Sequence, residues 1–352
     1  MSAPESMTDQ QYQDFILQGV SRTFALTIPQ LPPPLDRVVG NAYLLCRIAD
    51  TIEDDPDLAF EHKKAFSLRF VALVREGGDS GTFASELGAA LSPRATPAEH
   101  DLIRNTPRVL RITHACNANQ RHAMARCVEI MADGMVRYQG TETLAGLTNQ
   151  RAMDHYCYYV AGVVGEMLTD LFCDFAPDIA ANKTALDRLA ISFGQGLQMT
   201  NILKDIWEDR SRGACWLPRD RFAAHGVNLL SLDPSASQPQ FEAALGELIG
   251  IAHGHLQNAL HYTLLIPARH RGIRRFCLWA LGMAVLTLRK LNQHRDFRHG
   301  SEVKISRRAV KTTIVLCNAG AGSAVALKTL FSVASIGVPH SDIEPPAAPR
   351  AD

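Results

Sequence analysis

Apolar residues in this chain recur mainly at intervals of three and four positions, and the strict alternation typical of β-strands is scarce. This spacing collects apolar side chains on one face of an α-helix, so it predicts an all-α fold. Helices are predicted over residues 36–54, 119–138, 151–174, 184–210, 241–264, 272–295 and 306–335, with Pro-, Ser- and Gly-rich loops at 29–34, 211–218 and 233–239. We expect a single domain over residues 1–338 and a disordered, Pro- and Ala-rich tail over residues 339–352.

Two acidic sequences with the pattern D-x-x-E-D lie within these predicted helices. They are Asp50-Thr-Ile-Glu-Asp54 and Asp205-Ile-Trp-Glu-Asp209. A helix returns to the same face after four residues, so each motif forms a carboxylate pair, which costs an isolated helix a few tenths of a kcal/mol. A hard cation would offset that cost, and Mg²⁺ binds carboxylates while leaving positions for substrate phosphates. The pair of motifs therefore predicts Mg²⁺-dependent diphosphate chemistry.

The second motif extends toward the N-terminus as Gln198-x-x-Asn201-x-x-x-Asp205. Amide and carboxylate oxygens thus recur along a helix whose other positions are largely apolar, which predicts a buried polar stripe that needs partners. The alternative is a solvated helix face, and for either motif alone that explanation is about as good. Two such motifs in one chain favour the metal site.

Composition excludes several classes of protein. The chain is 46% hydrophobic and 20% charged, as expected of a globular protein with a sizeable core. Its 36 Lys and Arg balance 36 Asp and Glu, so no overall basic field exists to attract nucleic acid and no such partner is expected. The eight cysteines are scattered singly, without zinc-site spacing, which favours reduced thiols and a cytoplasmic location.

Membrane contact is expected to be weak and peripheral. Residues 1–11 are polar and contain no apolar core of a signal peptide. The apolar run over residues 312–327 is shorter than the roughly 20 residues that span a bilayer. The predicted helix over 306–335 mixes apolar and basic residues, so it can pack on the fold or lie in the headgroup region.

Four sequence blocks in the order S-R-T-F (21–24), R-I-A-D-T-I-E-D-D (47–55), Y-C-Y-Y-V-A-G-V-V-G (156–165) and N-I-L-K-D-I-W-E-D (201–209) resemble the squalene and phytoene synthases, over about residues 15–310. These are head-to-head prenyl transferases. The resemblance implies a class I isoprenoid synthase fold, a helical bundle with a central apolar cavity and two facing aspartate-rich helices. It implies Mg²⁺-dependent joining of two farnesyl diphosphates to presqualene diphosphate.

The resemblance also assigns roles to residues. The metal ligands would be Asp50, Glu53, Asp54, Asn201, Asp205 and Asp209. Diphosphate would be held by Arg22, Arg47, Arg210 and Arg212, since arginine grips phosphate oxygens in pairs. Other substrate contacts would come from Ser21, Phe24, Val160, Val164 and Gln198.

Tyr156 would lie beside the cationic intermediates. By spacing alone, Tyr156, Val160, Val163, Val164 and Met167 form one helical face, for which an ordinary core stripe is the simpler explanation. Ala161 and Gly165, four apart, would permit close helix packing or make room for a prenyl chain, and close packing is the commoner reason.

Within the family, the first motif and the Tyr156 block look more like the squalene branch, whose reaction ends with hydride from NADPH. By that resemblance Phe276, Lys304 and Lys204 would serve NADPH, although Ser306 stands where a basic residue is expected. Ala214 replaces an arginine typical of phytoene synthases. The alternatives are a dehydrosqualene or phytoene synthase without NADPH, and a non-catalytic prenyl-lipid binder, which would need no metal carboxylates. A monomer is expected.

Overall fold

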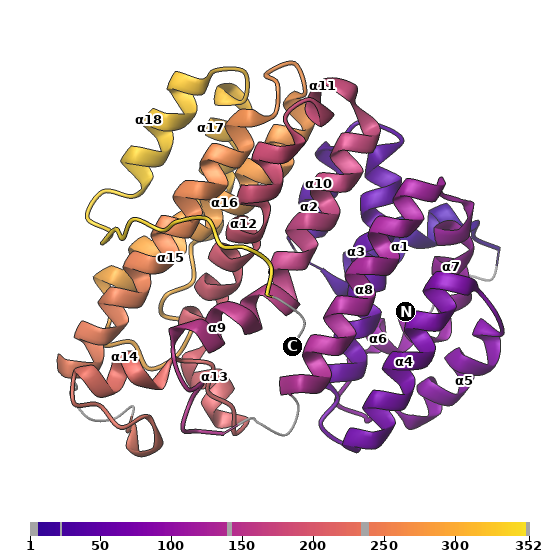
Figure 1. Cartoon of the computed structure of the whole chain (residues 1–352), viewed down its shortest axis with the longest axis horizontal. Helices are drawn as coiled ribbons and strands as arrows, with labels where there is room; N and C mark the ends of the chain where they lie inside the picture. The colour runs from indigo at the N-terminus through magenta and orange to yellow at the C-terminus, as the bar shows by residue number, and fades with distance from the viewer. Residues whose placement is uncertain (1–5, 22, 139–142, 234–238, 350–352) are drawn as a thin grey trace. The chain divides into compact units, whose positions relative to one another are not determined.

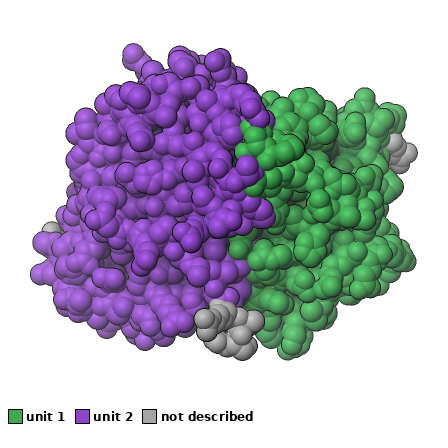
Figure 2. Space-filling view, turned by 45° about the horizontal axis from the view of Figure 1, so that its top comes forward, with its two compact units in different colours: residues 1–140, 166–180 green, residues 141–165, 181–352 purple. Residues whose placement is uncertain are grey.

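The computed structural model describes residues 6–21, 23–138, 143–233 and 239–349. Within these ranges the regular secondary structure is helical, apart from one isolated bridge between Leu147 and Pro218, and the all-α prediction is confirmed (Figure 1). Contacts divide the chain into unit 1 (residues 1–140 and 166–180) and unit 2 (residues 141–165 and 181–352), which Figure 2 colours separately. The expectation of a single domain with a central cavity concerns how these units combine, and it stays a prediction.

Unit 1 is organised around α3, whose apolar face is fully buried. Leu44, Leu45, Ile48 and Ile52 are each 0% exposed and pack among the surrounding helices. Burying one such side chain stabilises the fold by about 1.5–3 kcal/mol, so Leu45→Ala should cost about 2–5 kcal/mol. The helices of unit 1 are α1 (Asp9–Val20), α2 (Phe24–Thr27), η1 (Ile28–Gln30), α3 (Leu35–Asp54), α4 (Phe60–Glu76), α5 (Ser80–Ala90), α6 (Pro97–Arg104), α7 (Thr106–Ala115), α8 (Ala118–Tyr138) and α11 (Pro177–Ala180).

Unit 2 is built around α12 and α15, which pack closely along their lengths. Helix α10 (Val163–Phe175) begins in this unit and continues in unit 1. The other elements of unit 2 are α9 (Gln150–Cys157), the π-helical turn η2 (Tyr158–Gly162), α12 (Lys183–Lys204), α13 (Ile206–Ser211), α14 (Arg219–Ala224), η3 (Leu229–Ser231), α15 (Pro239–Leu265), α16 (Arg271–Gln293), α17 (Arg307–Gly320) and α18 (Ala324–Ala334).

Two glycines let α12 approach the η2 region. A Cβ on Gly165 would collide with the carbonyl oxygen of Ala190, and one on Gly194 would collide with the carbonyl of Ala161. Close packing, the preferred explanation for Gly165, is therefore confirmed.

Two predicted helices are broken by residues that are not helical. The helix predicted over 184–210 breaks at Asp205, whose φ of −102° and ψ of 15° separate α12 from α13. The helix predicted over 306–335 is divided by a turn at residues 321–323 into α17 and α18, because the Gly320-Ala-Gly322 sequence disfavours a continuous helix. The described part of the chain contains no helix that is long and apolar enough to cross a membrane.

The segment after α18 packs on α15, although we expected disorder from residue 339 onward. The N–H of Ser341 donates to the carbonyl of Gly250 (3.1 Å), and Asn258 Nδ2 donates to the carbonyl of Ile343 (3.1 Å). A Cβ on Gly254 would collide with the carbonyl of Ser341, so the glycine makes room for the segment. The prediction of disorder is wrong for Ser341–Ile343, because composition does not reveal a groove formed by a distant helix.

Candidate active site

The first acidic motif forms the last turn of α3. Asp50 and Glu53 are partly buried and Asp54 is exposed, yet desolvation also raises the pKa of Asp54. The C-terminal end of a helix carries partial negative charge, and this last turn contains no basic residue to offset it. Partial burial and the neighbouring Asp54 raise the pKa of Asp50 to about 7. A bound cation would relieve these unfavourable effects, so the donor set fits Mg²⁺.

Arg47, one turn before Asp50, is engaged within unit 1. Its Nη2 pairs with Oε1 of Glu99 on α6. The other oxygen of Glu99 accepts a hydrogen bond from the N–H of Thr96 (2.7 Å). Burial raises the pKa of Glu99, but the hydrogen bonds from Thr96 and the charge of Arg47 together lower it by more. The pKa is therefore below its ordinary value, and Glu99 stays ionised. The arginine is therefore held beside the acidic turn, and its contact with phosphate stays a prediction.

Asp55, directly after the motif, has a structural role. It is 4% exposed, and its carboxylate accepts hydrogen bonds from the N–H groups of Asp57 (3.0 Å), Leu58 (3.2 Å) and Ser92 (2.8 Å). Burial raises the pKa of Asp55, yet these hydrogen bonds bring it below its ordinary value. Asp55 thus fixes the chain where α3 ends and is distinct from the candidate metal ligands.

The second acidic motif lies at the junction of α12 and α13. The N–H of Asp205 donates to the carbonyl of Asn201 (2.9 Å), and that of Asp209 donates to the carbonyl of Asp205 (2.9 Å), so the four-residue spacing persists through the break. Like the first motif, Asp205 stands at a helix C-terminus. Lys204 Nζ lies 3.0 Å from Asp205 Oδ2, which marks this carboxylate as a favourable position for positive charge.

The predicted burial of the polar stripe is wrong in part. Asn201 is exposed, whereas Gln198, Asp205 and Asp209 are partly buried. The apolar flank of the stripe is buried as predicted, with Met199 and Leu203 both 0% exposed. The polar face of α12 is therefore open to a ligand over at least its last turn.

The loop between α16 and α17 packs on the second motif. The N–H of Gly300 donates to Glu208 Oε1 (2.9 Å), and Trp207 Nε1 donates to the carbonyl of Phe297 (2.7 Å). These two contacts use the residues between Asp205 and Asp209, so the loop and the acidic junction form one structural element.

The predicted NADPH contacts fall into different surroundings. Lys304 lies in this same loop with an exposed side chain, and its carbonyl accepts a hydrogen bond from Lys290 Nζ (2.8 Å). Lys204 lies at the junction on which the loop packs, and it is paired with Asp205. Phe276 is only 6% exposed on α16, within the core of unit 2. Contact between any of the three and a nicotinamide cofactor stays a prediction.

The predicted diphosphate arginines after the second motif lie near the end of α13. Arg210 Nη1 donates to the carbonyl of Leu144 (3.3 Å), in the segment before α9, and Arg212 is exposed. Both side chains are in unit 2 with Asp205 and Asp209.

The first sequence block is described only in part. Arg22 lies outside the described residues. Ser21 Oγ accepts a hydrogen bond from the N–H of Phe24 (2.9 Å) at the start of α2, which is a capping role. The ring of Phe24 lies 5.0 Å from that of Tyr43 on α3. These interactions do not test whether Ser21 and Phe24 contact the substrate, so both contacts stay predictions.

A π-helical turn interrupts the Tyr156 block. The N–H of Val163 donates to the carbonyl of Tyr158, five residues earlier, which adds one residue to the turn. Such turns are frequent at functional sites. The prediction of a single apolar face is wrong, because Val163 and Met167 are buried (0% and 3% exposed) while other members of the stripe remain partly exposed. The partly exposed members are Tyr156, Val160 and Val164.

Trp216 is a candidate site residue that sequence analysis missed. Its ring stacks on that of Tyr156, with centroids 4.0 Å apart and planes within 6° of parallel. The loop that carries it is fixed by backbone hydrogen bonds from Leu147 to Leu217 (2.9 Å) and from Arg219 to Leu147 (2.8 Å). The available signal was a tryptophan, one of three in the chain, seven positions after Asp209.

The acidic motifs do not form a complete metal cage. Among the described residues, no group of three or more His, Cys, Asp or Glu side chains is arranged to hold a metal ion. Mg²⁺ commonly takes only one or two carboxylates and completes its coordination with water and phosphate. The two motifs belong to different units, so the expectation that they face each other stays a prediction.

Comparison with known proteins identifies the family. A family model described as squalene/phytoene synthase matches residues 17–309. The chain belongs to the squalene/phytoene synthase family. The resemblance inferred from the four sequence blocks is therefore confirmed.

Individual members of the squalene/phytoene synthase family show how far the similarity extends. The squalene synthase of Eremothecium gossypii is 30% identical over 281 residues, which cover 78% of this chain and 60% of that protein. Matches to three curated squalene synthases cover 56% to 65% of those proteins' own length.

Solved structures establish the shared fold. The structure of TcSQS with the ligand E5700 matches with a TM-score of 0.76 and 23% identity, over 93% of this chain and 90% of that one. A dehydrosqualene synthase in complex with a ligand matches with a TM-score of 0.63 and 20% identity, over 88% of this chain and 95% of that one. Enzymes named for different products thus share the fold of the squalene/phytoene synthase family, and the fold alone does not select the product.

Proposed function

We propose that this protein is a squalene synthase, which joins two farnesyl diphosphates to presqualene diphosphate and then forms squalene by reductive rearrangement. The observation that carries the proposal is that each D-x-x-E-D motif places carboxylates at a helix C-terminus, with Asp50 and Asp54 in the last turn of α3 and Asp205 at the end of α12. Carboxylates are unfavourable there unless a cation offsets them. Similarity to curated squalene synthases supports this choice within the family.

Mg²⁺ would supply positive charge to the diphosphate leaving group as an allylic carbon–oxygen bond ionises. The side chains that would hold the ion are Asp50, Glu53, Asp54, Asn201, Asp205 and Asp209. Arginine guanidinium groups would bind the remaining phosphate oxygens in pairs and orient the leaving group. These arginines are Arg22, Arg47, Arg210 and Arg212.

The Tyr156–Trp216 stack would stabilise the carbocations that ionisation creates. The interaction of a cation with the face of an aromatic ring is favourable by about 0.5–2 kcal/mol, and it is stronger where water is excluded. Val160 within the π-turn and Val164 just after it are partly exposed, and they would line the path of the prenyl chain and keep water from the cation. Ser21, Phe24 and Gln198 would complete the substrate contacts.

NADPH would supply the hydride that ends the reaction. Lys304 and Lys204 would bind its phosphate groups, with Phe276 near the nicotinamide. Support comes from the exposed side chain of Lys304 and from the packing of its loop on the second acidic motif. Without this cofactor the same cation would lose a proton, and the enzyme would be a dehydrosqualene synthase.

We further propose that the enzyme acts in the cytoplasm as a monomer with no nucleic-acid partner. The balance of 36 basic and 36 acidic residues gives no overall field that would attract nucleic acid.

Product identification tests the proposal. Purified protein is incubated with farnesyl diphosphate and Mg²⁺, with and without NADPH, and the hydrocarbon and any presqualene diphosphate are identified. Squalene that forms only when NADPH is present supports the proposal, and Asp205→Asn should abolish turnover under the same conditions. Dehydrosqualene as the only product in both incubations would favour the alternative. Binding of farnesyl diphosphate without any turnover would favour a non-catalytic lipid-binding protein.

A further inference from the structure

The last part of unit 2 is strongly depleted of acidic residues. From Leu248 to Ser341 the sequence contains thirteen Lys and Arg but only two acids, Asp296 and Glu302. The chain as a whole has a formal net charge of 0, so this excess of positive charge is local. No acidic residue occurs within α16, α17 or α18.

The same region exposes apolar side chains in helical stripes. On α17, Arg308, Lys311, Val315 and Leu316 follow a spacing of three, four and one and are all exposed, with Val315 at 65% and Leu316 at 44%. This spacing places them on one side of the helix. The outward side of α17 is therefore basic in its first half and apolar in its second.

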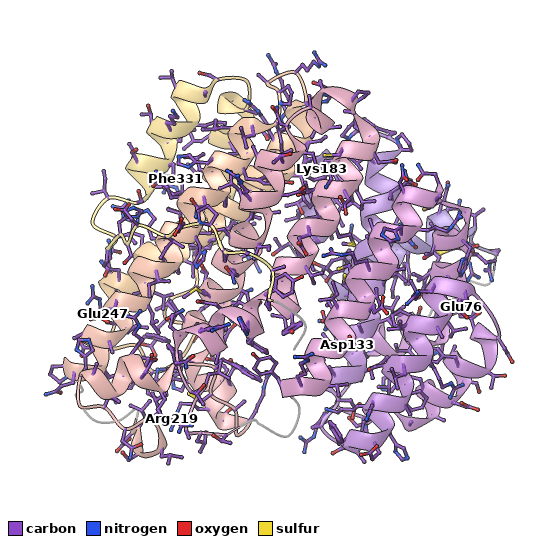
Figure 3. All side chains as sticks on the ribbon, viewed as in Figure 1. Glu76, Asp133, Lys183, Arg219, Glu247 and Phe331 are labelled. Carbon is purple, nitrogen blue, oxygen red and sulfur yellow. The ribbon has the colours of Figure 1, made fainter. Side chains whose placement is uncertain are left out.

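Helix α18 also exposes apolar and basic side chains together. Val325 is 75% exposed, Val333 is 55% exposed, and the exposed Lys328 lies between them. Ile336, just past the helix, is 62% exposed. The inward side of α18 is closed by Phe331, which is labelled in Figure 3, is 8% exposed and stacks on His253 of α15. The outer side therefore exposes apolar side chains although Phe331 is already buried on the inner side.

An apolar groove joins the two stripes. It has a volume of about 480 Å³ and lies among α16, α17 and α18. Leu316 and Val333 line it and are also exposed, so both stripes reach its rim, and Arg289 and Arg308 are the charged residues of its lining. The groove thus combines an apolar floor with basic residues.

We propose that the outer face of α17 and α18, defined by Arg308, Lys311, Val315, Leu316, Val325, Lys328, Val333 and Ile336, docks on an anionic lipid bilayer. Its apolar side chains enter the boundary between headgroups and acyl chains, and its basic side chains meet the anionic headgroups. A second copy of the chain is a poorer occupant, because two identical basic faces repel each other. The inference concerns binding alone and does not depend on the proposed chemistry.

Vesicle co-sedimentation of the full chain tests the surface. We expect binding to phosphatidylglycerol-containing vesicles, weak binding to pure phosphatidylcholine vesicles, and release by added salt. Removing one charge near the bilayer should weaken binding about fivefold, so Lys311→Gln with Lys328→Gln should weaken it about 25-fold. Val333→Glu should reduce binding at least as much as one lost charge.

Unit 1 supplies matched controls, because Lys64 and Leu68 are exposed on one side of α4 and Leu68 (57%) matches Val333 in exposure. Lys64→Gln and Leu68→Glu should leave vesicle binding unchanged. An equal loss of binding in the controls, or equal binding to neutral and anionic vesicles, would overturn the proposal. So would a dimer that dissociates in Val333→Glu while vesicle binding persists, since the face would then be an interface between copies.

Depth of insertion gives an independent measurement. Val333→Trp should show fluorescence quenching by brominated lipids in anionic vesicles, above the level of the unsubstituted protein with its three native tryptophans. Leu68→Trp should show no such increase. Equal quenching in both variants, or no increase in Val333→Trp, would contradict docking through α18.

Discussion

Tyr156 and Trp216 form a nearly parallel ring stack, 4.0 Å between centroids, although they are separated by the whole of α12 and α13. The stack joins the π-turn region to the loop after the second acidic motif. We expect Trp216→Ala to lower turnover about 2- to 30-fold, because an aromatic face contributes about 0.5–2 kcal/mol to the stabilisation of a nearby cation. Trp216→Phe should restore much of the activity. Steady-state rates, with circular dichroism as the control for folding, measure this; equal rates for the Ala and Phe variants would contradict an aromatic role.

Asp54 and Asp55 are adjacent acids with separate roles, which makes them a matched pair. Asp54→Asn should leave stability nearly unchanged and lower turnover by two or more orders of magnitude, as loss of roughly 3 kcal/mol of transition-state stabilisation implies. Asp55→Asn should cost about 1–3 kcal/mol of folding stability, because its three hydrogen bonds are impaired, while the Mg²⁺ dependence of activity is retained. Near-normal turnover in Asp54→Asn would refute the metal site.

Asp50 should make the effect of Mg²⁺ on stability depend on pH. Its pKa is raised from 3.8 to about 7 in the folded state. Between these values the folded state holds a proton that the unfolded chain has lost, so this stabilising contribution is complete below pH 3.8 and is lost as the pH rises through about 7. Mg²⁺ binds the ionised carboxylate and should raise the melting temperature more at pH 8 than at pH 6.

Thermal unfolding with and without Mg²⁺ at both pH values measures that difference. Asp50→Asn should remove most of it, because the group that titrates is gone. A Mg²⁺-induced shift of the same size at pH 6 and pH 8 in the unsubstituted protein would show that Asp50 does not control metal binding.

Gly165→Ala should destabilise the fold, because the new methyl group meets the backbone of α12 at Ala190 rather than a movable side chain. Overpacking of this kind typically costs about 1–3 kcal/mol. Gly88→Ala on α5 is the control: its nearest neighbour would be Arg104 Cγ at 3.8 Å, an ordinary contact. The control should be neutral or stabilising by about 0.5–1 kcal/mol. Denaturant unfolding distinguishes the two variants, and equal stabilities would contradict the close packing.

Lys304→Ala should impair only the reductive half of the proposed reaction. Presqualene diphosphate should accumulate at limiting NADPH while farnesyl diphosphate is still consumed, because the lost charge serves the cofactor and not the first condensation. Lys64→Ala, an exposed lysine of unit 1, is the control and should not change the products. An unchanged squalene yield in Lys304→Ala at limiting NADPH would remove Lys304 from the cofactor site.

Long helices with regular apolar spacing could be predicted closely from the sequence. The expected 36–54, 119–138 and 241–264 correspond to α3, α8 and α15 with ends shifted by at most two residues. Helix α5 is rich in small residues, so its periodic signal is weak. Helices α6 and α7 are amphipathic but only 8 and 10 residues long, so few turns carry the signal. Helix α4 was missed although Phe66, Phe70 and Leu73 carry a clear helical spacing.

The site was predictable where its signal is local. The acidic motifs depend on a four-residue spacing that the sequence displays directly, and they also carried the family resemblance. The break at Asp205, the π-turn and the partner of Tyr156 could not be predicted, since each depends on packing between segments far apart in the chain. Gly165 and Gly194 are informative only once α12 is known to cross the π-turn.

The segment packed on α15 affects the order in which unit 2 can fold. His253 Nδ1 donates to the carbonyl of Pro339 (2.8 Å) across 86 positions of the sequence, and Asn258 reaches Ile343 across 85. During synthesis, α15 must leave the ribosome well before the residues that fill its glycine-lined groove. Until they arrive, the groove remains open to water and to other nascent chains, so completion of unit 2 depends on a late, long-range closure that slows folding.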